Sequence, residues 1–555
     1  MLDNFKGKVY PFLHSDQMEP TYPPSVGSYP TLFLFPVPSF ADAYQDIHTA
    51  GLEIFADIIC RRKLMQGHYL SWWPEPRFRE NLGNRVDRTN DYDDILNNMF
   101  QELADRQLLD YKDGKWILRV EEQQQHVLDK IKKRQFSIIP ENTRARYRRF
   151  FEGPHEWPVS SGGQEQRFSP WFITSALLLN AIGDSGNKGS FQTLLSIDGT
   201  GMKALAGMML LGLHLSGDIP VKEIVSLKSD QQAEAFRFFD SERFGLSANP
   251  GHYHCDTRQM GYGKRLLERF ANKLWNTARF VAIHTEPGEE QDIDFTTANP
   301  INLWFAHLLT THIERINDLM DQYRVNEALI QTRNFFQKDF SNWYLQMIKP
   351  WLDDSSTKAF LRFFLKEFLL LLNPFLPALC RNIGKRLFNE SLIADRMEYP
   401  SFDGNMIFPE HFARVELLRE LIRYTRTLRE ETGIGPSEEF AVLLYSKSKN
   451  ERDMLVGLIP SFNQMTRSRE AVVTGEFTPG QSMILGRYAN WKLLFTFSSA
   501  IETTRIKKRL EQELAQISDK IYKLENGTFS QTTKKSLQEL FKRKERIKTL
   551  INDIS

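Results

Sequence analysis

The stretch from 268 to 280 divides the chain into two kinds of sequence pattern. Its apolar residues Phe270, Leu274, Ala278 and Val281 recur at helical spacing, which predicts a helix with one buried face. Four polar residues point away from that face and could meet an anion: Asn272, Lys273, Asn276 and Arg279. Residues before this helix show mixed strand and helix patterns, whereas those after it are helical to about 435. The chain must therefore combine an α/β domain with an all-α domain.

The composition is that of an ordinary globular protein. The 555 residues are 41% hydrophobic and 25% charged, and such a length favours about three to four domains. A formal net charge of +1 excludes a uniformly basic polyanion binder. It leaves room for a basic face that acidic surface balances elsewhere.

Cysteine usage and hydropathy indicate a cytoplasmic location. The three cysteines contain no Cys-x-x-Cys pair, so we expect neither a disulfide framework nor a zinc ribbon. His252, His254 and Cys255 lie close together but lack a second ligand pair, so no metal site is expected. The N-terminus does not resemble a signal peptide, and no apolar run is long and uncharged enough to span a bilayer. We expect no membrane partner.

Residues 1–245 show the pattern of a Rossmann-like α/β domain. A strand at 31–38, a helix at 51–65 and a strand at 68–73 are the opening of a nucleotide-binding unit. Helical pattern covers 91–133, a strand at 136–140 precedes a helix through 149, and 157–166 is predicted as a loop. The domain ends with helices at 171–182 and 201–215 and a strand at 223–227.

Three further domains are predicted after residue 245. Residues 246–437 form a helix bundle, with helices at 260–284, 302–323, 327–351, 357–380 and 412–431. Residues 438–500 are a small α/β unit with strands at 441–445 and 491–497 around a helix at 451–465. Residues 501–555 carry a basic excess and two apolar-periodic stretches around Asn526-Gly527, which predicts an antiparallel coiled-coil hairpin.

Five landmarks in the C-terminal half, taken in order, resemble the valyl-tRNA synthetase family of class I aminoacyl-tRNA synthetases. They are Asn-Lys-Leu-Trp-Asn-Thr-Ala-Arg-Phe at 272–280, Asn-Trp-Tyr-Leu-Gln-Met-Ile-Lys-Pro at 342–350, Asn-Pro-Phe-Leu-Pro at 373–377, the Arg-x-x-Arg-x-Glu stretch from 426 to 437, and the closing hairpin with Lys-Leu-Glu-Asn at 523–526. The resemblance implies a class I core, an anticodon-binding bundle and a tRNA-contacting coiled coil.

The N-terminal half resembles the same family less closely. Lys-Leu-Met-Gln-Gly at 63–67 with Trp72 and Pro74, Glu156-Trp157 with Ser160, and Gly-Leu-His-Leu-Ser-Gly-Asp-Ile-Pro at 212–220 are similar to family motifs. The family inserts an editing domain between the positions of Trp116 and Trp157, where this chain has only about forty residues. We therefore expect no hydrolytic proofreading.

Both catalytic signatures of the family are degenerate in this chain. Counted back from Gln66-Gly67, the residues Asp46, His48 and Thr49 occupy the positions of His-x-Gly-His, whereas counted forward from Pro36, His48 is its second histidine. In either register the first histidine and the glycine are absent. Only Lys228 and Ser229 remain of Lys-Met-Ser-Lys-Ser. A single lysine cannot supply the two ammonium groups that neutralise charge developing on pyrophosphate.

The resemblance also locates the equivalents of the amino-acid pocket: Pro38, Trp72, Arg77 and Ala204. Arg77 stands where the family has the aspartate that receives the ammonium of valine. A guanidinium facing an ammonium at about 4 Å costs on the order of a few kcal/mol at an effective dielectric near 20. Ala204 replaces a tryptophan that lines the family's pocket.

Basic residues in the C-terminal half are candidates for tRNA contact. Arg426 and Arg429 lie on a helix that the family uses near the anticodon, although a solvated face would explain them equally well. The hairpin adds two basic stripes that could hold phosphates with salt-dependent affinity. These stripes are Lys507, Lys508, Arg509, Lys542, Arg543 and Lys544.

Three functions are compatible with these patterns. The first is a synthetase-like protein that binds tRNA, or a partner taking its place such as an authentic synthetase, without charging it and without a cofactor. The second is a divergent but working valine–tRNA ligase that uses ATP. The third is a structural or interaction protein derived from a synthetase. Exchange of pyrophosphate with ATP separates the first two, and salt-dependent tRNA binding separates the first from the third.

Overall fold

A computed structural model describes most of the chain beyond residue 90 and short parts before it. The described residues are 31–36, 58, 59, 62, 66, 70–72, 91–139, 141–162, 168–169, 171–173, 175–176, 179, 191–197, 202–219, 223–229, 254–255, 260–285, 293–296, 298–388, 398–435, 438–476, 483–497, 500–525 and 531–554. They divide into two compact units, of which the first holds 1–289, 312–334 and 365–401, and the second the remainder. No described helix is long and apolar enough to cross a membrane. The predicted domain boundaries at 245, 437 and 500 stay predictions.

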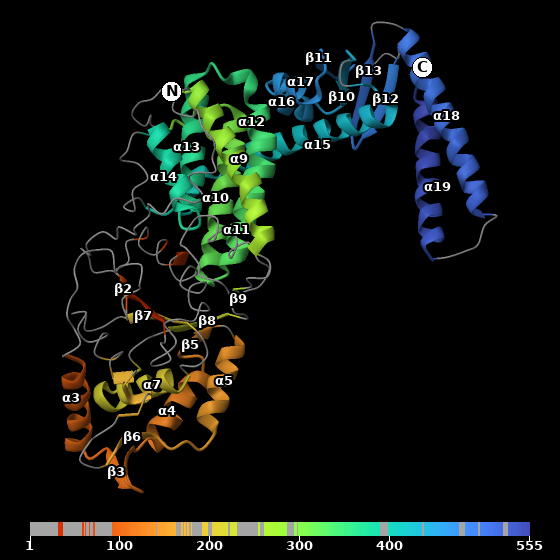
Figure 1. Cartoon of the computed structure of the whole chain (residues 1–555). Helices are drawn as coiled ribbons and strands as arrows, with labels where there is room; N and C mark the ends of the chain where they lie inside the picture. The colour runs from red at the N-terminus through yellow and green to blue at the C-terminus, as the bar shows by residue number, and fades with distance from the viewer. Residues whose placement is uncertain are drawn as a thin grey trace. The chain divides into compact units, whose positions relative to one another are not determined.

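The first unit contains a parallel sheet (Figure 1). Its strand order is β2-β1-β7-β8-β5, and β9 pairs with the end of β8. The strands are β1 (Thr31–Pro36), β2 (Leu70–Trp72), β5 (Ser137–Ile139), β7 (Phe191–Ile197), β8 (Glu223–Ser229) and β9 (His254–Cys255). The chain moves from β1 to β2 in one direction and from β7 to β8 in the other, so a topological switch point lies between β1 and β7. The predicted Rossmann-like topology agrees with this sheet.

Helices α4 (Glu121–Lys132), α5 (Glu141–Glu152) and α7 (Met202–Ser216) accompany the sheet. Helix α7 is apolar on most sides, and Met208, Met209, Leu210 and Leu211 are all fully buried. An all-round apolar helix of this kind belongs in a protein core. Central strand β7 was missed from the sequence, where the helices at 171–182 and 201–215 were read as consecutive elements.

A separate antiparallel sheet, β3-β4-β6, corrects two predictions. Residues 91–133 are not one helix, because α3 (Asp91–Asp105) is followed by a hairpin of β3 (Leu109–Lys112) and β4 (Lys115–Leu118) before α4. Asp113 and Gly114 turn the hairpin at positive φ, 52° and 72°, which Asp-Gly readily adopts. Strand β6 (Pro158–Ser161) replaces the start of the predicted loop at 157–166, since β4 supplies its backbone partners.

Helix α9 (Met260–His284) confirms the helix predicted at 260–284. Phe270, Leu274, Ala278 and Val281 are all fully buried. Within the first unit α9 packs against α14 (Pro377–Phe388), and the Arg386 guanidinium lies 5.2 Å from the ring centre of Trp275.

Arg62 is a buried cation in the same unit. Its side chain donates to Asp321 Oδ1 at 2.7 Å and to Asn317 Oδ1 at 2.9 Å, and its guanidinium lies 5.3 Å from the ring centre of Tyr399. The sequence placed Arg62 near a helix C-terminus, where a cation suits the dipole. In the structure its guanidinium contacts residues more than 250 positions further along the chain, and the local sequence pattern cannot predict such contacts.

Helices α10 (Pro300–Asp321) and α13 (Ser355–Leu372) contribute residues to both units. In the second unit, Phe305 lies within 5.6 Å, centre to centre, of the rings of Phe335, Phe340, Tyr344 and Phe364. Two predicted helices are broken. The helix predicted at 327–351 is divided into α11 (Val325–Phe335), a π-helix η6 (Phe336–Tyr344), α12 (Leu345–Met347) and a 3-10 turn. The helix predicted at 357–380 ends near Asn373-Pro374, before α14 begins.

Helix α15 (Pro409–Thr432) leads into a small sheet of order β11-β10-β13-β12. Its strands are β10 (Ala441–Tyr445), β11 (Glu470–Thr474), β12 (Met483–Tyr488) and β13 (Trp491–Thr496), of which β11 and β12 were not predicted. The predicted helix at 451–465 is divided into α16 (Lys449–Val456) and α17 (Ile459–Thr466) around Gly457 and Pro460.

Helices α18 (Ala500–Glu525) and α19 (Gln531–Asn552) form the predicted C-terminal hairpin (Figure 1). Their apolar residues are buried, among them Ile506, Leu510, Ile517, Ile521, Leu537 and Ile547. The end of α19 adds to the small sheet, because Leu485 donates its backbone N–H to Asp553 O at 3.0 Å. The two helices pack along one another, and a supercoil stays a prediction.

Candidate functional site

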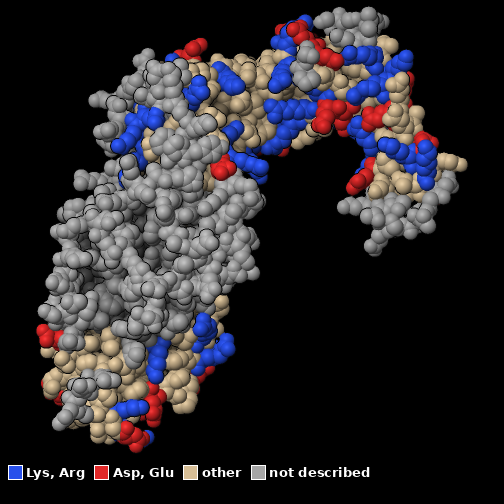
Figure 2. All heavy atoms as spheres, in the orientation of Figure 1, with Lys and Arg blue, Asp and Glu red and all other residues tan. Residues whose placement is uncertain are grey.

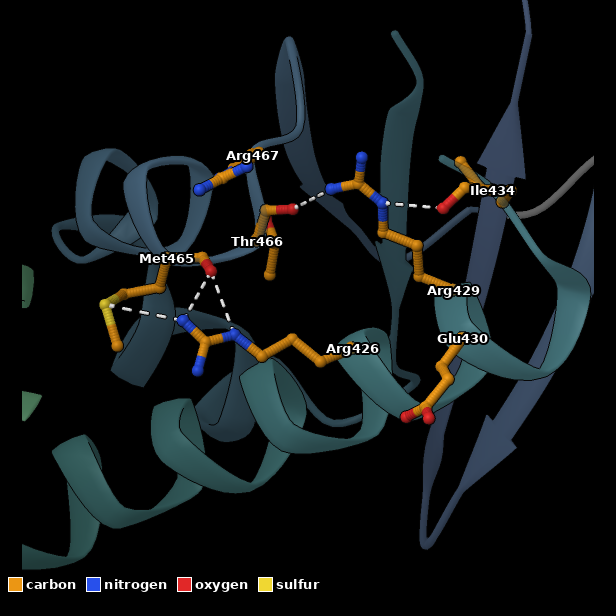
Figure 3. Close-up of a pocket in the computed structure, with 7 residues that line it drawn as sticks. All are labelled: Arg426, Arg429, Glu430, Ile434, Met465, Thr466 and Arg467. Atoms are coloured by element: carbon orange, nitrogen blue, oxygen red, sulfur yellow. Dashed lines mark hydrogen bonds between the residues drawn. The ribbon is translucent and has the colours of Figure 1, made fainter. Parts of the chain in front are cut away.

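The end of α15 and the end of α17 form a pocket that three arginines line (Figure 3). Arg426 and Arg429 lie one turn apart on α15, directly after the buried residues Thr425 and Leu428. Arg467 caps α17 in the left-handed region, with φ of 59°. The pocket has a volume of about 450 Å³ and is completed by Glu430, Ile434, Met465 and Thr466. We call it the arginine pocket.

Two of these guanidiniums are fixed by backbone carbonyls. Arg426 donates Nε and Nη2 to Met465 O at 3.0 and 2.7 Å, and Arg429 donates Nη1 to Thr466 O at 2.9 Å. Arg429 also donates to Ile434 O at 3.4 Å and to Gly435 O. The carbonyls at the end of α17 lack helical partners, so arginine donors suit them both as hydrogen bonds and as positive charge at a helix C-terminus. Arg426 and Arg429 are therefore not a merely solvated face.

The positive charge in the arginine pocket is only partly compensated. Burial lowers the pKa of Arg426, and the nearby charge of Arg467 lowers it further. The same two causes, burial first, lower the pKa of Arg429, against which Glu438 acts. Arginine nevertheless stays protonated at neutral pH. An anion that entered the pocket would relieve this repulsion and would meet planar donors suited to phosphate or carboxylate oxygens.

A stack of cations and aromatic rings connects the bundle core to the arginine pocket. The guanidiniums of Arg419, Arg423 and Arg426 lie 4.7, 5.1 and 5.7 Å from the ring centre of Trp343, a residue of the π-helix. Such distances are typical of cation–π contacts. The π-helical turn, a feature often found at functional sites, positions Trp343 among the arginines of α15.

Arg419 anchors this stack from inside. It is 7% exposed and pairs with Asp339 at 3.0 Å and Glu416 at 2.5 Å, while Trp304 Nε1 donates to Glu416 at 3.0 Å. Burial raises the pKa of Asp339, and the charge of Arg419 opposes that rise. The carboxylates of Asp339 and Glu416 neutralise the charge of Arg419. This arginine therefore orients Trp343 and does not offer a free charge to a ligand.

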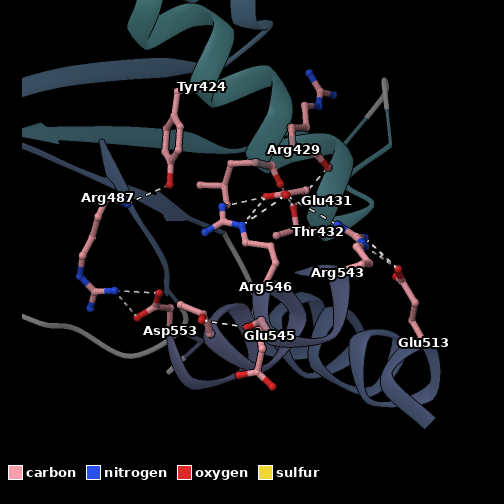
Figure 4. A network of polar contacts seen from close by, with 12 residues as sticks. Tyr424, Arg429, Glu431, Thr432, Arg487, Glu513, Arg543, Glu545, Arg546 and Asp553 are labelled. Carbon is pink, nitrogen blue, oxygen red and sulfur yellow. Dashed lines mark hydrogen bonds and ion pairs between the residues drawn. The ribbon is translucent and has the colours of Figure 1, made fainter. Parts of the chain in front are cut away.

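The C-terminal hairpin uses part of its basic stripes for its own attachment (Figure 4). Arg543 pairs with Glu513 at 2.8 Å and lies 3.6 Å from Glu431, the residue after the pocket's Glu430. Arg509 donates to the backbone carbonyl of Glu431 at 3.0 Å. Internal carboxylate and carbonyl groups thus engage Arg543 and Arg509, and contact of these two arginines with phosphates stays a prediction.

Arg546 also attaches the hairpin to Glu431, and it was not singled out from the sequence. It donates to Glu431 Oε2 at 2.8 Å, and this hydrogen bond raises its pKa. Arg487 of β12 pairs with Asp553 at 2.8 Å. Gly433 ends α15 with φ of 67°, a left-handed conformation that favours glycine, and the Arg509 guanidinium occupies the space beside it.

The remaining hairpin candidates face solvent or lie at its edge. Lys507, Lys508 and Lys542 are exposed, Lys544 is half-buried, and none of the four has an ion pair within the part of the chain that the structure describes. They remain candidates for phosphate contact.

The polar side of α9 is placed as predicted. Asn272, Asn276 and Arg279 are exposed and Lys273 is half-buried, on the side opposite the buried residues. Helix α9 belongs to the first unit and the arginine pocket to the second, so each is a separate candidate surface.

Known proteins resemble this chain in the region of the pocket. A family model described as the anticodon-binding domain of tRNA ligase matches residues 302–444, which include Trp343, Arg426 and Arg429 but not Arg467. Valine–tRNA ligase from Carboxydothermus hydrogenoformans is 26% identical over 348 residues, covering 58% of this chain and 39% of that ligase. The chain belongs to the class I aminoacyl-tRNA synthetase family.

Two further valine–tRNA ligases show the same partial coverage. The ligase of Geobacter sulfurreducens is 24% identical and covers 59% of this chain and 40% of its own length, and that of Borrelia garinii subsp. bavariensis is 28% identical, with 63% and 43%. This chain thus spans about two fifths of the length of these relatives. An apo structure of Mycobacterium tuberculosis methionyl-tRNA synthetase overlaps 67% of this chain and 97% of that chain, with a TM-score of 0.48 and 13% identity.

The class I signature positions are only partly described. Asp46, His48, Thr49, Pro38 and Arg77 lie outside the described residues. Trp72 is the last residue of β2, and Ala204 lies in the first turn of α7.

Lys228 and Ser229 are strand residues, not loop residues beyond a strand. They end β8 and pair with His254 and Cys255 of β9. The predicted strand at 223–227 is therefore two residues longer, because β9 supplies partners that its short sequence did not reveal. A backbone held in a ladder on both residues is less free to close over a nucleotide than a loop would be.

Sequence reasoning missed Arg467, Arg419, Trp343 and Arg546. Arg467 directly follows the predicted helix at 451–465, and a cation after a helix end is a recognisable capping signal. Trp343 belongs to the family motif at 342–350, but the sequence did not indicate what this residue contacts. Nothing in the sequence joins these residues to Arg426, because the contacts arise from helices distant along the chain.

Proposed function

We propose that this chain binds tRNA through the arginine pocket and does not charge it with an amino acid. The observation that carries the proposal is the gathering of Arg426, Arg429 and Arg467 around one pocket, next to Trp343. Two of the three arginines and the tryptophan fall within the span that matches the anticodon-binding family model.

The chemistry of the arginine pocket suits the sugar–phosphate backbone of RNA. Guanidiniums bind phosphate oxygens in a planar, bidentate manner, and Arg426 and Arg429 are already oriented by the α17 carbonyls. Little conformational entropy remains to be lost on binding. An unstacked base beside the phosphate could stack on the Trp343 ring or on the Arg423 guanidinium plane, as bases of RNA loops do.

Loss of charging activity is proposed from the signature positions. Asp46 brings negative charge where the triphosphate would lie, and Arg77 opposes the ammonium of an amino acid. Lys228 and Ser229 lie in a strand. The proposed function requires no cofactor, and ATP enters only under the alternative below.

Filter binding of tRNA tests the pocket. Arg467→Asn removes one charge yet suits the left-handed backbone, since asparagine tolerates positive φ. We expect a loss of affinity of about tenfold, the worth of one charge-assisted contact. Lys447→Gln removes an equally exposed charge that does not line the pocket, and should leave affinity within about twofold. Equal affinity of wild type and Arg467→Asn, or no tRNA binding at low salt, would refute the proposal.

The alternative is a divergent but working valine–tRNA ligase that acts alone or with a partner subunit. Its support is that the relatives carry that name while each aligns over 58–63% of this chain. Valine-dependent exchange of pyrophosphate with ATP distinguishes the two functions, because only the ligase forms an adenylate.

A further inference from the structure

The α4–β5–α5 segment of the first unit concentrates positive charge. Between residues 130 and 152 there are eight lysines and arginines and two glutamates, a net charge of +6 in a chain whose total is +1. Figure 2 shows Lys and Arg side chains gathered over α4 and α5. The arginine pocket belongs to the other unit, so this charge is a separate feature.

The last turns of α4 and α5 are held side by side. Glu152 accepts a hydrogen bond from Arg148 Nε at 3.1 Å and lies 3.6 Å from Lys132 Nζ. The hydrogen bond from Arg148 and the charge of Lys132 lower the pKa of Glu152. One carboxylate therefore joins the two helices and neutralises only part of the charge that they bring together.

Four cations around this junction keep their full charge. Lys133 caps α4, Arg134 follows it, and Arg146 and Arg149 lie one turn apart on α5. All four are exposed, and across the described ranges none of them has an ion pair. We call them the basic surface.

Stabilisation of the helix ends explains only part of the basic surface. A cation in the last turn of a helix stabilises that helix through the helix dipole. Arg146 lies in the middle of α5, beyond the reach of that effect, and Arg134 lies outside either helix. The surplus charge therefore indicates a polyanionic partner.

We propose that the basic surface binds the backbone of double-stranded RNA. Double-stranded RNA is recognised mostly through phosphates and 2′-hydroxyls, whereas single strands also need aromatic rings for base stacking. The aromatic residues of α5 are not available for stacking, because Tyr147 and Phe151 are buried and Phe150 stacks on His155 with ring centres 4.1 Å apart. This inference goes beyond the proposed function, since it adds a second RNA contact on the other unit.

The test uses the full chain and a blunt RNA duplex of about 16 base pairs, the length that a double-stranded RNA-binding domain spans. The variant K133Q/R146Q/R149Q removes three exposed charges from the basic surface. The control K112Q/K115Q/R119Q removes three charges from strands β3 and β4 and the residue after them, in the same unit. Both are also made together with R467N, so that any duplex binding at the arginine pocket is subtracted.

We expect K133Q/R146Q/R149Q to weaken duplex binding at least tenfold and to flatten the plot of log affinity against log salt by about two to three units, while the control changes affinity less than about threefold. The same results are expected in the R467N background. Circular dichroism and thermal midpoints should match the wild type, and R146E alone should repeat the loss if the triple variant does not fold. Equal losses in variant and control overturn the proposal. So does binding to phosphatidylserine vesicles or to polyglutamate without binding of the duplex.

Discussion

Arg419 is a buried cation that contacts two carboxylates and two tryptophan rings in the helix bundle. Its side chain is held by Asp339 and Glu416 and lies 5.1 and 4.7 Å from the ring centres of Trp304 and Trp343. Removing a charge from such a group leaves its partners uncompensated, which costs more than the pair contributes.

The substitution Arg419→Met should lower the free energy of unfolding by about 3 kcal/mol, because Asp339 and Glu416 lose their counter-charge. Arg423→Met is the matched control. Arg423 lies over the same ring but is exposed, so we expect a loss of about 0.5–1 kcal/mol. Urea denaturation measures both. Losses of equal size would show that the ion pairs around Arg419 contribute nothing.

His312 gives the first unit a predictable dependence on pH. Burial, with a smaller effect from the charge of Arg315, lowers its pKa to about 3. The unfolded chain binds a proton near pH 6.5, whereas the folded chain does not, so stability is fully present above pH 6.5 and falls as pH decreases toward 3. Between pH 6.5 and 5 the loss attributable to His312 should be about 2 kcal/mol.

His312→Leu removes this titration and should flatten the dependence by that amount. The measurement is the difference in urea midpoint between pH 6.5 and pH 5 for wild type and variant. Parallel pH profiles would mean that folding leaves the proton affinity of the His312 imidazole unchanged, which contradicts the lowered pKa.

At the scale of elements, long periodic helices were predictable and short strands were not. Helix α9 was placed correctly because twenty-five residues carry one continuous apolar stripe. Strands β6, β7 and β11 were missed because each depends on a partner far along the chain, which local pattern does not contain. The β3–β4 hairpin had a local signal, Asp113-Gly114, that the surrounding charged residues obscured.

Attachment of the C-terminal hairpin depends on Glu431, which receives Arg546 and lies near Arg543. Glu431→Gln should release the hairpin locally, by about 1–2 kcal/mol, since two half-buried arginines lose their charge partner. Hydrogen exchange of the α18 and α19 amides should then quicken about tenfold. Glu545→Gln, which breaks only the exposed pair with Lys548, is the control. Unchanged exchange in Glu431→Gln would assign the attachment to the β12 contacts instead.

At the scale of the whole molecule, the sequence predicted the combination of a parallel-sheet domain, helices and a terminal hairpin, and the family to which the chain belongs. It also predicted Arg426 and Arg429 as candidates. It could not predict the arginine pocket, because Arg467 reaches the other two only through the packing of α17 against α15. Nor could it predict that Arg509 contacts the Glu431 carbonyl and that Arg543 pairs with Glu513.

We propose that RNA binding persists in this chain and that synthetase chemistry does not. Valine-dependent exchange of pyrophosphate with ATP, measured on a preparation that retains tRNA on a filter, tests that claim most directly. We predict exchange no greater than in the absence of protein, because no adenylate forms. Exchange that requires valine and rises in proportion to the amount of protein would contradict the account and would establish a working ligase.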